Sequence, residues 1–148
     1  FSERSYDIIL ETQHISMECL KYVVKYKCPV SDSVWAKCMS KPTLDILEYL
    51  IANISHDDID LVKIAVEHDS PLGLKCVLPE FADITPSFLE ALSNGRYLVV
   101  RYIVQSHTPC VATIPVVIHD SCVNYIRAYK YMPAFMFSMY NFILDRLY

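Results

Sequence analysis

The residues of this chain that could do chemistry begin with two adjacent pairs, His68-Asp69 and His119-Asp120. A histidine beside a carboxylate can act as a general base that the carboxylate orients, so each pair suggests a hydrolase. Both pairs also fall near the end of an expected helix, where a histidine can interact with the last carbonyl groups and the negative helix end. We favour this structural interpretation, because the chain has only two glycines and no Gly-rich phosphate loop, HExxH motif or Ser nucleophile elbow. We therefore predict no enzymatic activity and no cofactor.

The cysteines are the second set of candidate ligands, and the chain has six of them. Zinc sites commonly use CxxC pairs, and the sequence contains none. No secretory signal is visible, so we expect no disulfides either. We predict free thiols, no bound metal and a reducing compartment. Four thiols are expected to be small buried residues of helices: Cys19, Cys38, Cys76 and Cys122.

The elements that carry these residues recur along the chain at nearly constant spacing. Each copy is a short apolar phrase with one or two charged residues, such as Asp45-Ile46-Leu47-Glu48-Tyr49-Leu50. Successive anchor residues of the five copies are 27, 27, 26 and 26 residues apart, and they are Leu20, Leu47, Leu74, Val100 and Ile126. A fixed period of this size indicates a repeat array, in which each unit buries its apolar face against its neighbours.

A second rhythm accompanies the first. Nine residues before each of the last four anchors, another apolar helix ends, at Cys38, Ala65, Ala91 and Val117. Three of these four residues are small, as two closely crossing helices require. The pattern predicts an all-α fold, an α-solenoid of stacked antiparallel helix pairs with short connectors and no sheet. We expect one domain over residues 1–148 with about five repeats and a terminal helix over 131–148.

The phrase Glu18-Cys19-Leu20-Lys21-Tyr22 with Cys28-Pro29, and Ser93-Asn94-Gly95 with Val99-Val100-Arg101-Tyr102, resemble the ankyrin repeat. The closer likeness is to the shortened, degenerate ankyrin-like repeats of large DNA viruses of eukaryotes. The chain departs from the ordinary form in its shorter period, in lacking a Thr-Pro-Leu-His start, and in placing Pro42 and Asp69 at the turn glycine. The resemblance implies a protein-binding scaffold with a rigid solenoid surface. It also implies a viral protein inside the host cell, in the cytoplasm or the nucleus.

Charge and hydropathy restrict the partners. The net charge is −4 and the 13 basic residues are scattered, whereas nucleic acid requires a basic stripe. The longest apolar run near the end, 131–144, is too short to span a bilayer. We therefore predict another protein, of the host or the virus, as the partner, with no nucleic acid and no membrane span.

Candidate partner-binding residues fall in two groups. In ankyrin-like solenoids the first helices line the concave side, which makes Trp35, Lys37 and Lys63 candidates, although for Trp35 we favour packing between repeats. At the end of the chain we expect Phe137, Tyr140 and Tyr148 to face outward and contact a second chain. A second set is expected to bury against residues 124–130, because it follows helical spacing: Phe135, Met139, Phe142 and Ile143.

A charged residue follows each anchor, and we expect this position to face solvent, since its helical neighbours are buried. The five residues are Lys21, Glu48, Lys75, Arg101 and Arg127. The function that these observations favour is a scaffold that binds a host or viral protein, of the host-interaction or immune-evasion type. The alternative is a structural or assembly component that forms a homo-oligomer through its aromatic C-terminal helix.

Overall fold

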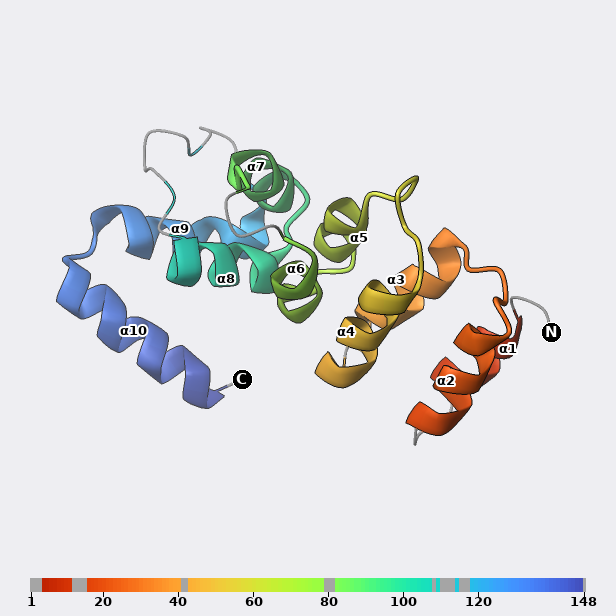
Figure 1. The fold of residues 1–148 in the computed structure, drawn as a ribbon. Helices are drawn as coiled ribbons and strands as arrows, with labels where there is room; N and C mark the ends of the chain where they lie inside the picture. The colour runs from red at the N-terminus through yellow and green to blue at the C-terminus, as the bar shows by residue number, and fades with distance from the viewer. Residues whose placement is uncertain are drawn as a thin grey trace. The chain divides into compact units, whose positions relative to one another are not determined.

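The structure is a computed structural model, which describes residues 4–11, 16–40, 43–78, 82–107, 109, 114 and 118–147. These residues form ten α-helices and no strand, so the predicted all-α class is confirmed (Figure 1). The chain divides into two compact units, Phe1–Asp83 and Ile84–Tyr148. A single repeat domain across both units stays a prediction.

The first unit contains six short helices in consecutive pairs: α1 (Arg4–Glu11), α2 (Met17–Lys25), α3 (Asp32–Ser40), α4 (Leu44–Asn53), α5 (Leu61–Glu67) and α6 (Pro71–Val77). Within each pair the two helices contact each other. The first helices also contact one another, α1 with α3 and α3 with α5, and α4 contacts α6. Each pair therefore packs on the next through helices in the same position of the pair.

The second unit contains four helices: α7 (Thr85–Ser93), α8 (Tyr97–His107), α9 (Asp120–Tyr131) and α10 (Ala134–Leu147). Helix α8 contacts both α7 and α9. The segment before α9 is fixed to the α7–α8 turn, because the His119 amide donates to the Leu92 carbonyl at 3.1 Å and Ser121 Oγ donates to the Gly95 carbonyl at 3.0 Å.

The anchor residues lie in the core, as their spacing predicts. Leu20, Leu47, Leu74 and Val100 have no exposed area, and Ile126 is 1 % exposed. The small residues of the second rhythm, Cys38, Ala65 and Ala91, are buried as well, whereas Val117 lies outside the described residues. Burial at a constant interval means that the period in the sequence is a period in packing.

Two turns show the same period in their backbone conformation. Asp69 follows α5 with φ +49°, and Gly95 follows α7 with φ +69°. The two residues are 26 positions apart, which is one repeat. Asp69 therefore takes the left-handed conformation that the turn requires, although glycine adopts it with less strain.

Candidate functional site

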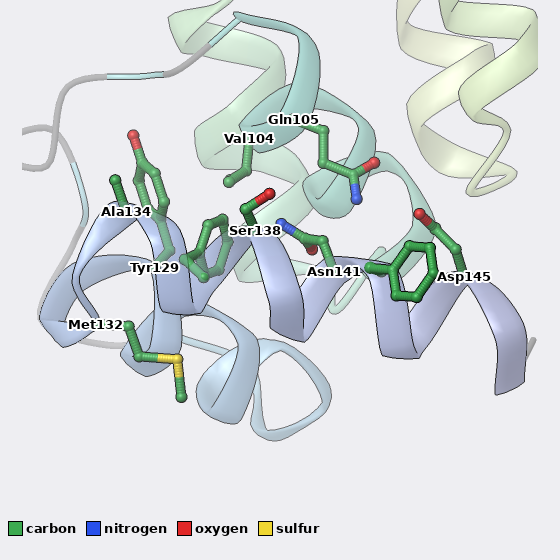
Figure 2. A pocket seen from close by; sticks show the side chains of 10 residues that line it. Val104, Gln105, Tyr129, Met132, Ala134, Ser138, Asn141 and Asp145 are labelled. Atoms are coloured by element: carbon green, nitrogen blue, oxygen red, sulfur yellow. The ribbon is translucent and has the colours of Figure 1, made fainter.

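The largest cavity that we describe lies in the second unit, beside α10, and has a volume of about 620 Å³. Figure 2 shows Val104 and Gln105 of α8 on one side of it and Ser138 and Asn141 of α10 on the other. Tyr129 and Met132 come from the end of α9 and the segment after it. The remaining wall residues are Ala134, Phe137, Phe142 and Asp145. Apolar and aromatic walls with a few polar groups are typical of binding pockets.

Helix α10 is held beside this cavity by aromatic rings. The Phe137 ring lies 5.6 Å from the ring of Tyr125 and 5.4 Å from that of Tyr129, measured between centroids. Tyr140 also lies 6.1 Å from Tyr125. The Tyr125 hydroxyl donates to Asn141 Oδ1 at 2.8 Å, and burial raises the pKa of this hydroxyl above its ordinary value. These contacts turn the Phe137, Tyr140 and Asn141 side of α10 toward α9.

This orientation contradicts both expectations for the last helix. Phe137 and Tyr140 were expected to face outward, but they pack on Tyr125. The set expected to be buried is instead 53 to 69 % exposed: Phe135, Met139, Phe142 and Ile143. Helix α10 is apolar on several sides, so two stripes of residues satisfy helical spacing. Contacts with the aromatic rings of α9 determine which stripe packs. Tyr148 lies outside the described residues.

Arg101 is a further correction. Lys21, Glu48, Lys75 and Arg127 are exposed as expected, but Arg101 is only 8 % exposed. Its guanidinium forms an ion pair with Asp145 of α10, while its Nε atom is buried and has no hydrogen-bond partner among the described residues. A carboxylate from a distant helix thus allows a charged residue to be buried at this repeat position.

Trp35 does not offer its ring to a partner, because it has no exposed area. Its ring lies edge-on to His56, 6.0 Å away between centroids. Trp35 is therefore a core residue, as the favoured packing interpretation predicted, and not an exposed anchor.

The two candidate lysines differ in how they are bonded. Lys37 Nζ lies 2.8 Å from Asp7 and 2.9 Å from Glu11, both on α1, and these bonds raise the pKa of Lys37. The Lys37 charge thus joins α3 to α1. Lys63 is more exposed and lies 3.9 Å from Glu67 on its own helix.

The two histidines of the His-Asp pairs have structural partners. His68 Nδ1 lies 3.0 Å from Ser40 Oγ, and this hydroxyl donates its own proton to the Ala36 carbonyl at 2.8 Å. His68 is then the donor toward the hydroxyl, which is the reverse of a catalytic base. His119 was expected near the end of a helix but instead caps the start of α9, where its Nδ1 accepts from the Ser121 amide at 3.3 Å. That the chain is no enzyme stays a prediction.

The cysteines agree with the expectation only in part. Cys19, Cys28, Cys38 and Cys76 are free thiols, and Cys110 lies outside the described residues. Cys38 and Cys122 are buried as expected, but Cys76 is partly exposed and Cys19 is exposed. Cys19 directly precedes the buried Leu20, and one helical step turns it away from the core. Within the described ranges, no three His, Cys, Asp or Glu side chains are grouped to hold a metal ion.

The sequence carried no motif for the cavity, because its polar residues come from separate helices. One signal was present: Asp145 and Arg146 are the only charges in residues 131–148, and a lone carboxylate in an apolar helix indicates a partner.

None of the helices that the structure describes is long and apolar enough to cross a membrane. Comparisons with protein-family models, with curated proteins and with solved structures find no match to this chain.

Proposed function

We propose that this chain is a protein–protein interaction scaffold, built as an ankyrin-like α-solenoid of stacked helix pairs. Three features support the solenoid: the contacts between equivalent helices of the first unit, the buried anchors, and the equivalent turns at Asp69 and Gly95. A rigid array of this kind presents an extended surface to a partner. The viral origin, the action in the host cell and the host or viral identity of the partner follow from the ankyrin-like resemblance.

The observation that carries the binding role is the cavity beside α10. Its volume of about 620 Å³ can take a large apolar side chain of a partner protein. Val104, Tyr129 and Phe137 would surround such a side chain, and the amide groups of Gln105 and Asn141 would bond to polar atoms beside it. Interface energy is commonly concentrated in one anchor that fills one pocket, so this cavity is the expected centre of the interface.

The alternative, an assembly component that self-associates, requires another surface. Phe137 and Tyr140, which the sequence assigned to that contact, are turned toward α9. The cavity therefore favours the scaffold as the first function.

A matched pair of substitutions tests the scaffold. Ser138→Trp fills the cavity from α10, while Ser93→Trp places the same side chain on the exposed end of α7 in the same unit. Proteins retained from host lysate by each variant are compared by quantitative mass spectrometry. We expect partners that bind the native and Ser93→Trp proteins equally and bind Ser138→Trp at least about tenfold more weakly.

The opposite result is equally clear. If every retained protein binds Ser138→Trp as well as it binds Ser93→Trp, the cavity is not the interface. Far-UV circular dichroism of both variants shows whether the helices are kept, so that loss of binding is not confused with unfolding.

A further inference from the structure

Helix α10 has a second apolar surface, on the side that does not face α9. We call it the outer stripe, and its residues are 45 to 71 % exposed: Phe135, Met136, Met139, Phe142, Ile143 and Leu147. Their spacing of three or four residues places them along one side of the helix. The helix contains no buried residue at all, so nothing in the described chain covers this stripe. Phe142 also borders the cavity, but the other five residues do not line it.

The area of the outer stripe is large for a surface in water. A large apolar side chain offers about 200 Å², so the exposed parts of these six residues sum to roughly 700 Å². Monomeric proteins rarely keep an apolar patch above about 300–600 Å². A stable interface buries about 800 Å² on each partner. The outer stripe thus has the area that one half of a dimer interface requires.

The stripe is also complementary to itself. A two-fold axis brings the same surface of both copies together, so each residue must match the residue opposite. In an antiparallel pair of α10 helices that cross at Met139, residues equally distant from Met139 face each other. Phe135 then meets Ile143 of the second copy, and Met136 meets Phe142.

The charges favour the antiparallel direction. Asp145 is bound to Arg101, and the Arg146 guanidinium lies over the Phe142 ring, 4.3 Å from its centroid. In a parallel pair, the two Arg146 side chains would lie beside each other and repel. In an antiparallel pair they lie at opposite ends of the interface.

We propose that two copies of this chain associate through their α10 helices, antiparallel and crossing at Met139, to form a symmetric dimer. The dimer goes beyond the scaffold function, because five of the six residues of the outer stripe do not line the cavity. Each copy keeps its own cavity, so the dimer would present two binding sites to partners. Paired sites raise the apparent affinity for a partner that is itself multivalent.

Position 139 allows a specific test, because in this dimer it meets its own copy on the axis. Met139→Glu and Met139→Lys each place two like charges together, so each variant should be monomeric, near 17.1 kDa by sedimentation equilibrium. The native chain should have twice that mass at micromolar concentration. An equimolar mixture of the two variants should again form a dimer, because the charges on the axis are then opposite. The control is Leu89→Glu, which also replaces an exposed apolar residue by glutamate, but on α7, and it should leave the dimer intact.

Four results would overturn the proposal. A native chain that is monomeric at about 100 μM excludes the dimer, because interfaces of this size normally associate far more tightly. Oligomers that Met139→Glu does not dissociate place the contact elsewhere. Monomeric single variants that fail to pair when mixed exclude the crossing at Met139. If the native monomer instead binds another protein and Met139→Glu abolishes that binding, the stripe belongs to that partner and not to a second copy. The scaffold function is unaffected by these outcomes, since Ser138→Trp tests it separately.

Discussion

Arg101 of α8 and Asp145 of α10 form an ion pair whose members lie in very different surroundings. The Arg101 side chain is 10 % exposed, and the Asp145 side chain is 62 % exposed. The pair links two helices that are 44 residues apart in the chain. Its main effect is to compensate the charge of the Arg101 guanidinium, which is desolvated by burial in the second unit.

We expect Asp145→Asn to reduce the free energy of unfolding by about 1–2 kcal/mol. Removing one member of a buried pair leaves the other uncompensated, which costs about 3–5 kcal/mol, and the exposure of Asp145 lowers that value. Urea unfolding measures the change. The matched control is Glu67→Gln, which removes the exposed pair with Lys63 and should cost less than about 0.5 kcal/mol. Equal losses in the two variants would show that burial of Arg101 adds nothing.

Leu74→Ala should cost about 2–5 kcal/mol, because Leu74 has no exposed area and the substitution leaves a cavity in α6. The control is Ile8→Ala on α1, where the side chain is 67 % exposed and the loss should stay within about 0.5 kcal/mol. Denaturant unfolding gives both values. A loss below about 1 kcal/mol for Leu74→Ala would contradict its place in the repeat core.

The equivalent turns allow a reciprocal exchange. Asp69→Gly should stabilise the chain by up to about 1 kcal/mol, because glycine adopts the positive φ of this turn without steric strain. Gly95→Asp should destabilise the chain by about 1–3 kcal/mol. A Cβ at Gly95 would also clash with His119 Nδ1, so this change disturbs the cap of α9 as well. Thermal unfolding of both variants is the measurement, and a loss of stability in Asp69→Gly would contradict the strain argument.

The thiols should separate by their reaction rates. Cys19 is exposed, whereas Cys38 is 3 % exposed and burial raises its thiol pKa to about 12. The thiolate is the reactive form, so Cys19 should react rapidly in the native chain and Cys38 only on unfolding. Cys19→Ser should remove a fast phase, and Cys38→Ser should not. In denaturant without reductant, all six thiols should titrate; fewer would indicate a disulfide or a bound metal.

Alkaline pH should weaken the fold. Burial raises the pKa of Cys38 from 9.0 and of Tyr6 from 10.0, each to about 12. The folded state therefore keeps protons that the unfolded state loses. Stability from these groups is complete below pH 9.0 and is lost as the pH rises toward about 12. Urea unfolding across this range should show a shallower decline for Cys38→Ala than for the native chain. Identical slopes would show that the Cys38 thiol does not contribute.

The repeat core was predictable from the sequence, because burial there is periodic. Leu20, Leu47 and Leu74 share one phrase, and a fixed interval gives each the same neighbours in the next unit. The side of α10 that packs was not predictable, since an apolar helix offers more than one stripe. Its choice depends on the rings of Tyr125 and Tyr129, which come from another helix.

The cavity and the burial of Arg101 could not be predicted from the sequence, for a related reason. The rule that the residue after an anchor faces solvent uses only its own helix. Arg101 breaks the rule because Asp145 reaches it from α10. The same holds for Trp35, since residue type alone does not distinguish an aromatic ring that packs inside from one that binds a partner.

The burial of Trp35 gives the molecule an optical asymmetry. Trp35 is the only tryptophan and belongs to the first unit, while seven of the eleven tyrosines belong to the second. When the chain is excited at a wavelength that tyrosine does not absorb, only Trp35 of α3 fluoresces. Its emission lies at short wavelengths, because the indole ring is shielded from water. Its fluorescence therefore follows the melting of the first unit, and circular dichroism follows every helix. Two superimposable melting curves would mean that both units unfold as one cooperative body, and two separated curves would assign a melting temperature to each.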